Sequence, residues 1–409
     1  MTKPLEGIKI VDLSRYLPGP LATQMLADFG AEVIKVEDRK GELGRFLLPM
    51  IEDTSARFYT VNRNKKSIGL DMKKPEGKEI FRKLIADADV VVDQFRPDVM
   101  NKMGLGYEDL KKINPRLIYC IITGYGLTGP MRDAAGHDVN YLNTAGVTEL
   151  MGTQEGPPSM CGVQIADTAG GSLYTVIAIL LALSAREKTG KGQLCDVAMM
   201  DGALSLLSYT IGEWSGGDGS LPKRGGELLT GGHATYRIYK CKDGRYVSLG
   251  AVEDKFWATF CTKLGKEEYI PLQMDVPKQP AIIADIEKIM LTRTRDEWVD
   301  FFSDSDICFT PVLTLDEMVK HPQVLARDMV HVLENFQGSG KDIVCTGVPV
   351  KLSETPGEAK FAFSKTGENT AEILASVGYS ADEIKKLLQD GVVSATEMPD
   401  TKSKASRTA

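Results

Sequence analysis

Short apolar runs alternate with amphipathic segments through the first half of the chain. The runs have the length and composition of buried strands, and the segments between them show the apolar spacing of helices. The first unit of this pattern is predicted to contain a strand at 8–13, a Pro18-Gly19-Pro20 loop, a helix at 21–29 that Gly30 ends, and a strand at 32–37. The same pattern predicts further strands at 67–72, 90–95, 117–123 and 193–198, and helices at 75–88 and after Asp167.

Strands that alternate with helices form a parallel sheet with helices on both faces, so the predicted fold class is α/β. A loose stretch rich in glycine and serine at 215–232 predicts a linker after the first part, 1–214, of a large domain. A smaller α+β domain is predicted at 233–328, with a hairpin that turns at Asp243-Gly244. Its expected elements are strands at 235–239 and 246–250 and helices at 255–264 and 282–302. Beyond it we expect strands at 330–333 and 348–350, helices at 370–377 and 380–389, and a frayed polar tail at 399–409.

Charge and composition argue against several classes of protein. The chain has 49 Lys and Arg residues against 56 Asp and Glu, a net charge of −7 and no basic cluster, so nucleic acid is not an expected partner. The seven cysteines form no Cys-x-x-Cys pair, which indicates reduced thiols in a cytoplasmic compartment and no metal site. Residues 168–185 carry no charge, but their glycine and hydroxyl residues favour a buried core helix over a membrane span. No membrane partner is therefore expected.

Motifs for common cofactors and hydrolases are missing from the sequence. The first strand-to-helix turn lacks Gly-x-Gly-x-x-Gly, which disfavours a nicotinamide or flavin cofactor. The sequence also lacks a phosphate-binding Gly-x-x-x-x-Gly-Lys-Ser/Thr loop, a Gly-x-Ser-x-Gly elbow and a His-Glu-x-x-His pair. Phosphate-loop enzymes, serine hydrolases and zinc proteases consequently lose support as classes.

Two residues are candidates for acid–base or nucleophilic chemistry. His137, one of four histidines, lies in the dense polar run 136–141, but it also fits a structural histidine at a loop or helix start. Asp167 precedes the uncharged segment, where a helix dipole keeps a carboxylate ionised and the Gly170-Gly171 pair leaves backbone amides open to a ligand. The alternative is that Asp167 only caps the helix. On these residues alone both alternatives stay open.

Six motifs in one order resemble the family III CoA-transferase (CaiB/BaiF) and acyl-CoA racemase superfamily, over essentially the whole chain. They are Leu13-Ser14 to Pro20, Leu26-Ala27-Asp28-Phe29-Gly30-Ala31, Asn62-Arg63-Asn64-Lys65-Lys66-Ser67, Leu70-Asp71-Met72-Lys73, Phe95-Arg96-Pro97 and Thr189-Gly190-Lys191-Gly192-Gln193. The resemblance implies a Rossmann-like large domain built from both chain ends, so that residues 329–398 return to it, with the smaller α+β domain between them. It also implies an interlocked homodimer.

The resemblance further implies an acyl-CoA thioester as substrate and no cofactor beyond CoA itself. It places the nucleotide end of CoA at Arg39 and at the 70–73 segment, with Arg96 as another contact. Arginine suits the phosphates of CoA because its guanidinium donates two parallel hydrogen bonds. The expected CoA and substrate contacts besides Arg39 and Arg96 are Leu70, Asp71, Met72, Lys73, Gly136, Asp138, Asn140 and Tyr141.

Two reactions occur on the scaffold that this sequence resembles. In the racemases, the residues that match Asp167 and His137 act as base and acid on the two faces of the α-carbon of a 2-methylacyl-CoA, and the one that matches Glu253 orients the histidine. In the transferases, the matching aspartate attacks the thioester and forms a mixed anhydride. The intact histidine motif and the short loop at 228–232 favour a racemase similar to α-methylacyl-CoA racemase. A CoA-transferase is the alternative, and a non-catalytic CoA-ester-binding subunit is a third.

Overall fold

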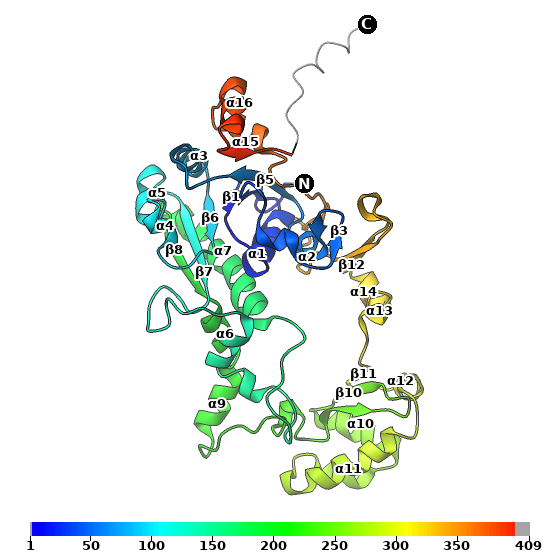
Figure 1. The fold of residues 1–409 in the computed structure, drawn as a ribbon. Coiled ribbons are helices and arrows are strands. Elements are labelled where there is room, and N and C mark those ends of the chain that lie inside the picture. The colour runs from blue at the N-terminus through cyan, green and yellow to red at the C-terminus, as the bar shows by residue number, and fades with distance from the viewer. Residues whose placement is uncertain (1, 397–409) are drawn as a thin grey trace. The chain divides into compact units, whose positions relative to one another are not determined.

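The chain forms two compact units. The computed structural model describes residues 2–396, so the frayed tail expected at 399–409 lies outside the described residues. One unit is drawn from Met1–Ala145, Val163–Leu206 and Leu325–Ala409, and the other from Gly146–Gly162 and Leu207–Val324. Figure 1 shows the elements of both units. The domain boundaries proposed from the sequence stay a prediction.

A seven-stranded sheet forms the centre of the first unit. Its order is β14-β5-β2-β1-β6-β7-β8, and every neighbouring pair is parallel except β14 with β5. The predicted α/β class with a parallel sheet is therefore confirmed. The strands are β1 (Lys9–Asp12), β2 (Glu32–Glu37), β5 (Lys65–Leu70), β6 (Val90–Asp93), β7 (Ile118–Thr123), β8 (Leu194–Ala198) and β14 (Val393–Ser394).

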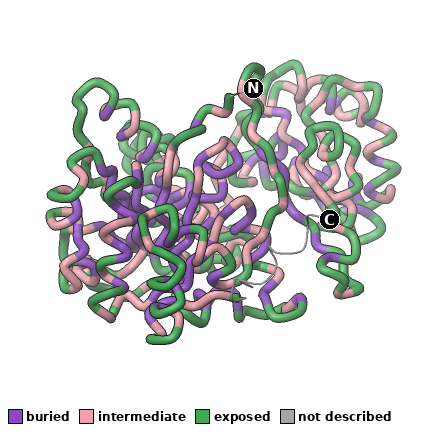
Figure 2. Tube along the Cα trace, turned by 90° about the horizontal axis from the view of Figure 1, so that it is seen from above, coloured by how far each residue is buried: buried purple, intermediate pink, exposed green. Residues whose placement is uncertain are grey.

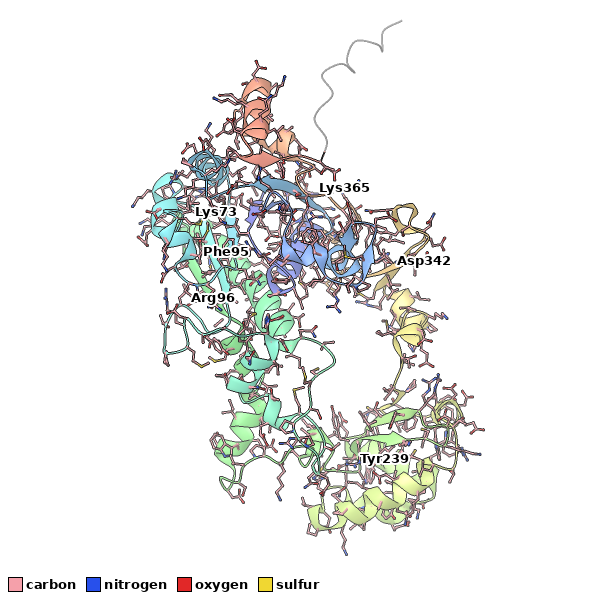
Figure 3. The ribbon with its side chains drawn as sticks, in the orientation of Figure 1. Lys73, Phe95, Arg96, Tyr239, Asp342 and Lys365 are labelled. Carbon is pink, nitrogen blue, oxygen red and sulfur yellow. The ribbon has the colours of Figure 1, made fainter. Side chains whose placement is uncertain are left out.

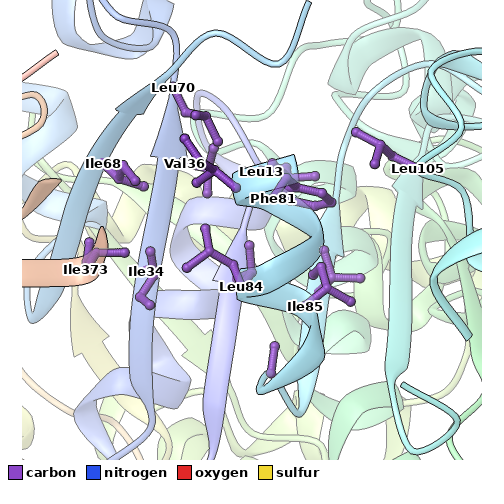
Figure 4. Packing of buried hydrophobic residues seen from close by; sticks show 14 of the residues in the cluster. Leu13, Ile34, Val36, Ile68, Leu70, Phe81, Leu84, Ile85, Leu105 and Ile373 are labelled. Atoms are coloured by element: carbon purple, nitrogen blue, oxygen red, sulfur yellow. The ribbon is translucent and has the colours of Figure 1, made fainter. Parts of the chain in front are cut away.

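Helices cover this sheet, and alternate strand residues point into the core. Ile34 and Val36 of β2 pack with Phe81 and Leu84 of α3 in one apolar cluster (Figure 4). Figure 2 shows that buried residues gather inside the trace and exposed ones on its outer loops. The remaining elements of this unit include α1 (Pro18–Asp28), β3 (Met50–Ile51), β4 (Thr54–Ser55), α2 (Ala56–Val61), α3 (Pro75–Ala86), α4 (Val99–Lys102), α5 (Tyr107–Ile113), α6 (Asp138–Thr144), the π-helix η3 (Ala166–Leu173), α7 (Tyr174–Thr189), α8 (Met199–Ser205), β12 (Val330–Leu333), β13 (Ile343–Thr346), α15 (Thr370–Ser376) and α16 (Ala381–Gln389).

Three expectations about local structure are wrong. Pro18-Gly19-Pro20 is the first turn of α1 rather than a loop, because a proline at a helix start loses no hydrogen bond. Residues 348–350 form no strand, since Pro349 has no N–H to donate to a ladder, and β13 pairs with β12 instead. The expected helix at 282–302 is two helices, because the Thr294 side chain accepts the Glu297 N–H and caps a new one.

The second unit has its own sheet and core. Its antiparallel strands β9 (Tyr236–Lys240), β10 (Tyr246–Gly250) and β11 (Phe309–Pro311) lie in the order β11-β10-β9. The predicted hairpin between β9 and β10 is confirmed. Trp257 and Phe260 stack with their ring centroids 5.7 Å apart in the core. The helices of this unit are α9 (Ser208–Gly216), α10 (Asp254–Leu264), α11 (Gln279–Met290), α12 (Arg295–Phe302) and α13 (Leu315–Met318). The next helix, α14 (Pro322–Ala326), spans the boundary between the two units.

The uncharged stretch after Asp167 forms η3 and α7 in succession. Residues Ala166–Thr189 are long and apolar enough to cross a membrane by length and composition, and 33% of their most apolar window is buried. The buried side of α7 includes Ile179 and Ala182, and α7 packs against β7, β8 and α1. The expected core helix is therefore buried on one side only.

A buried ion cluster lies between the sheet and the start of α1. Asp12 ends β1 and is fully buried, and Lys65 Nζ donates to Asp12 Oδ2 at 3.1 Å and to Pro20 O at 2.8 Å. Lys35 Nζ donates to Ser14 O at 2.9 Å. Burial raises the pKa of Asp12, but the Lys65 and Lys35 charges outweigh burial and hold that pKa below its usual range. The cluster therefore ties the loop between β1 and α1 to two neighbouring strands.

Replacing Asp12 tests how strongly this cluster stabilises the fold. Asp12→Asn keeps the side-chain size but leaves the Lys65 charge buried without its partner, so the free energy of unfolding should fall by about 3 to 5 kcal/mol. Urea denaturation measures this change. Asp87→Asn, which breaks the exposed pair with Lys9, is the control and should cost less than about 1 kcal/mol. Equal losses in the two variants would contradict the role given to the cluster.

Candidate active site

A cavity of about 600 Å³ lies at the ends of four parallel strands. In the sheet β1 separates β2 from β6, so the winding reverses at β1, and open α/β sheets bind ligands at such a point. Figure 3 labels Lys73 and Phe95, which follow β5 and β6 and line the cavity. The whole segment proposed from the sequence lines it as well, namely Leu70, Asp71, Met72 and Lys73.

Arg39 lies outside this cavity, and its expected contact with CoA stays a prediction. It is not among the residues that line the cavity. Its guanidinium lies beside the turn before β14, since a Cβ on Gly391 would be 2.5 Å from Arg39 Nη1, and Ser394 Oγ donates to Arg39 O at 2.8 Å. Arg15 and Lys40 are lining cations that the sequence analysis missed. Arg15 lies two residues after the predicted strand 8–13, which could have marked it, but nothing in the sequence distinguishes Lys40 from its neighbour Arg39.

Asp167 lies in the first turn of η3, half-buried. The capping alternative is wrong, because Ile165 is the N-cap residue and Asp167 follows it by two positions. The Asp167 N–H donates to Asp138 Oδ1 at 3.0 Å. Burial and then the Asp138 charge raise the pKa of Asp167 to about 6, and His137 opposes this rise. Asp167, Asp138 and His137 therefore share one electrostatic environment.

The glycine pair after Asp167 serves packing rather than ligand access. Gly170 and Gly171 are buried. A Cβ on Gly170 would lie 2.5 Å from Met199 O, and one on Gly171 would lie 3.1 Å from Pro18 Cβ. The expectation that their amides are open to a ligand is therefore wrong. The missing side chains let η3 approach α8 and α1 closely.

Tyr141 explains why the run around His137 begins with glycine. A Cβ on Gly136 would lie 2.6 Å from the Tyr141 ring, and one on Gly124 would lie 2.3 Å from it. The Tyr141 hydroxyl donates to Gly136 O at 2.5 Å. Burial, Asp167 and Tyr125 raise the pKa of Tyr141 to about 12, and Arg96 opposes them. The loop that leads to His137 is thus fixed by a buried ring.

His137 stands at the start of α6, with an exposed side chain. Its backbone N–H donates to Asn140 Oδ1 at 3.0 Å. The backbone of His137 thus has a structural role at the helix start, as the alternative to a catalytic histidine predicted. Arg96, labelled in Figure 3, is exposed in the loop after β6, and its charge acts on Tyr141. Of the predicted residues, the structure brings together His137, Asp138, Asp167, Tyr141 and Arg96.

Glu253 belongs to the second unit. It is exposed and is the N-cap residue of α10, where its carbonyl accepts the N–H groups of Phe256 at 3.0 Å and Trp257 at 3.1 Å. A carboxylate at this end of a helix is favoured by the helix dipole. That Glu253 orients His137 stays a prediction.

Within residues 2–396, no group of three or more His, Cys, Asp or Glu side chains is arranged to hold a metal ion. The cysteines are free thiols, and four of the seven are buried, namely Cys120, Cys241, Cys261 and Cys345. The expectation of chemistry without a metal or a separate cofactor stays a prediction.

Known proteins resemble this chain along nearly its full length. Residues 5–370 match the family described as CoA-transferase family III. The chain is 36% identical over 405 residues to an acyl-CoA transferase of Fusarium pseudograminearum, covering 95% of this chain and 88% of that protein. It is 35% identical over 398 residues to the α-methylacyl-CoA racemase of Homo sapiens, covering 96% and 98%. A solved CAIB/BAIF family protein from Brucella suis superposes with a TM-score of 0.81 at 34% identity, over 92% of this chain and 100% of that one.

The raised pKa of Asp167 can be tested without an activity assay. A carbodiimide with an amine modifies the protonated carboxyl, so labelling of Asp167 should fall as the pH rises through about 6. Asp138→Asn removes the like charge but keeps an oxygen for the Asp167 N–H, and the midpoint should move to lower pH. Peptide mass spectrometry measures the labelling. Asp133→Asn, an exposed neighbour on the same loop, should leave the midpoint in place, and a midpoint unmoved by Asp138→Asn would contradict the assignment.

Proposed function

Because the chain belongs to CoA-transferase family III, we propose that it is an acyl-CoA racemase that moves the α-proton of a 2-methylacyl-CoA thioester. The observation that carries this proposal is the shared environment of Asp167 and His137, in which a half-buried carboxyl with a pKa of about 6 faces the charge of an exposed imidazole. An acid and a base of this kind are what proton exchange at one carbon requires.

The reaction balances with these two groups alone. Ionised Asp167 takes the α-proton, the electron pair moves onto the thioester oxygen as an enolate, and protonated His137 delivers a proton to the opposite face. In the reverse direction neutral His137 takes the proton and protonated Asp167 returns one. A base with a pKa near the working pH is suited to this task, because both of its forms are populated. Glu253 is proposed to orient His137.

The cavity at the strand ends is proposed to hold the nucleotide part of CoA. Arg15, Lys40 and Lys73 supply cationic groups there, and apolar Leu70 and Met72 supply a surface for the base. Four carboxylates line the cavity too, but Glu37 is paired with Arg45 at 2.7 Å and Glu42 lies 3.6 Å from Lys35, which leaves Asp38 and Asp71 beside the three cations. Arg39 and Arg96 are proposed as further contacts, although neither lines the cavity. The proposed site needs no cofactor besides the CoA of its own substrate.

A CoA-transferase is the second candidate, and the similarity data favour it as much as the first. The relative named acyl-CoA transferase is 36% identical and the racemase 35% identical to this chain. Above its pKa of about 6 the Asp167 carboxylate is ionised, which also suits attack on a thioester carbonyl. The transferase then needs a second carboxylic acid to accept CoA, whereas the racemase does not.

The exposed side of α7 supports the proposal of a homodimer. Leu173 at the end of η3 and Ile177, Leu180 and Leu181 of α7 follow the spacing of one helix face and are exposed, Leu181 by 65%. Such a stripe on a helix that packs against a sheet is typical of a surface that another chain covers. We propose that a second copy of this chain covers it, and that the protein works in a reducing, cytoplasmic compartment in which its thiols stay free.

Deuterium incorporation separates the candidate reactions. One enantiomer of a 2-methylacyl-CoA is incubated with the protein in deuterated water and followed by NMR. The racemase should introduce deuterium at the α-carbon and lose optical purity without any added acid. No exchange, but a new CoA thioester once a carboxylic acid is supplied, would establish the transferase. Neither product, with CoA-ester binding intact, would establish a non-catalytic subunit.

The same deuterium experiment, repeated on variants, tests which residues carry the reaction. His137→Ala and Asp167→Asn should each slow exchange by at least about 100-fold, while acyl-CoA binding stays within a few-fold, because each removes one proton carrier. His321→Ala is the matched control and should leave exchange unchanged. A transferase should instead lose its activity in Asp167→Asn and keep most of it in His137→Ala.

The homodimer is tested at the same helix face. Leu181→Glu places a charge at the most exposed residue of the apolar stripe and should shift sedimentation from dimer to monomer. Leu315→Glu, at an exposed leucine of α13, is the control and should not change the mass. A monomeric wild-type chain, or wild-type binding to lipid vesicles through this face, would overturn the proposal.

A further inference from the structure

The backbone around Asp167 has an unusual conformation that needs support. Residues Ala166–Leu173 form a π-helix, and π-helical turns are rare and occur often at functional sites. A π-helix contains more residues per turn than the α-helix that continues from it as α7. Each residue of an α-helix advances about 100° around the axis, so removal of one residue from the wide turn rotates everything before it. The direction of the Asp167 side chain therefore depends on the wide turn.

Ser172 holds this turn against the start of α1. Its side chain is fully buried, and its hydroxyl donates to Pro18 O at 2.7 Å. The same hydroxyl lies 3.2 Å from the carbonyl oxygen of Asp167, so its single proton is shared in a three-centre bond whose shorter branch goes to Pro18 O. One side chain thus connects the residue that carries the carboxylate to a neighbouring helix.

The start of α1 is itself fixed from the side of the cavity. Gln94 Oε1 accepts the N–H of Gly19 at 3.2 Å and the N–H of Arg15 at 3.4 Å. Arg15 and Phe95, which follows Gln94, both line the cavity, and the Arg15 guanidinium lies 4.6 Å from the centre of the Phe95 ring. Pro18 is therefore a well-anchored acceptor for the Ser172 hydroxyl.

A comparison with Thr175 in the first turn of α7 shows that burial alone does not require such a bond. Thr175 lies three residues after Ser172 and is equally buried, yet its hydroxyl has no hydrogen-bond partner among residues 2–396. The two hydroxyls thus differ in their contacts and not in their exposure. This difference supplies a matched control for any effect of removing a buried hydroxyl.

We propose that Ser172 is a positioning residue, whose hydroxyl holds the π-helical turn against α1 and so fixes the place of the Asp167 carboxylate. This inference rests on the proposed function of Asp167 as the group that exchanges the proton. Misplacement of a reacting group by about 1 Å costs up to 100-fold in rate, without a matching loss of substrate binding. The effect of Ser172 should therefore appear in kcat rather than in KM.

The test compares Ser172→Ala with Thr175→Val. For α-proton exchange, Ser172→Ala should lower kcat about 10- to 100-fold with KM within threefold, and Thr175→Val should change neither. Hydrogen exchange measured by mass spectrometry gives a readout besides activity. Peptides that cover residues 165–175 should exchange faster in Ser172→Ala and at the wild-type rate in Thr175→Val.

Each outcome decides one point. Equal kcat and equal hydrogen exchange in the two variants would overturn the role of Ser172, and so would an effect of Ser172→Ala on KM alone. If Ser172→Ala does not fold, Ser172→Cys fills the same space with a weak donor, and a wild-type kcat in that variant would overturn the role too. A wild-type chain without proton exchange would instead refute the proposed function, and the hydrogen-exchange result would still decide whether Ser172 holds the turn.

Discussion

The salt bridge between Asp12 and Lys65 is the interaction on which the rest of the site depends. Both charges are fully buried, and the same ammonium also holds Pro20 O, inside the first turn of α1. In that turn, Pro18 O accepts a hydrogen bond from Ser172 of η3. The loop before the turn lines the cavity at the strand ends. A buried pair of this kind adds little net stability compared with apolar residues, but it tolerates only one arrangement of its partners. We infer that its value here is the fixed course of this loop.

Two neighbourhoods of different chemistry extend from this loop. The cavity is lined by apolar side chains, by the cations Arg15, Lys40 and Lys73 and by the carboxylates Glu37, Asp38, Glu42 and Asp71. Around Asp167, burial and the Asp138 carboxylate make ionisation costly, which raises the affinity of Asp167 for a proton. In the function proposed here, binding and proton transfer would therefore draw on separate side chains. Side-chain hydrogen bonds of Gln94 and Ser172 to the backbone at the start of α1 connect the two neighbourhoods.

Much of the sheet could be predicted from the sequence, because buried parallel strands are apolar runs bounded by turn residues. The bounds expected for β2 and β12 match the structure, and the helix at Pro75 begins where the proline indicates. The π-helix could not be predicted, since an apolar segment rich in glycine looks the same whether its turns are π or α. For the same reason the Gly170-Gly171 pair suggested open amides, although packing on Met199 explains it. That Arg39 lies beside the turn at Gly391 and not in the cavity could not be predicted, because a side chain's direction depends on a distant segment.

The two candidate reactions, racemisation and CoA transfer, would use the same surroundings of Asp167. Asp138 accepts the Asp167 N–H and helps to raise the pKa of Asp167, whereas Gly170 and Ser172 lie in the turn that carries this residue. In the proposed function, a carboxylate so held suits either a proton or a thioester carbonyl. These residues therefore do not distinguish the two candidate reactions. What separates them is the second acid: in one case an imidazole that delivers a proton, in the other a carboxylic acid that arrives from solution. The exposed His137 is the only one of these acids that the chain itself supplies, and this is why the proposed function rests on it.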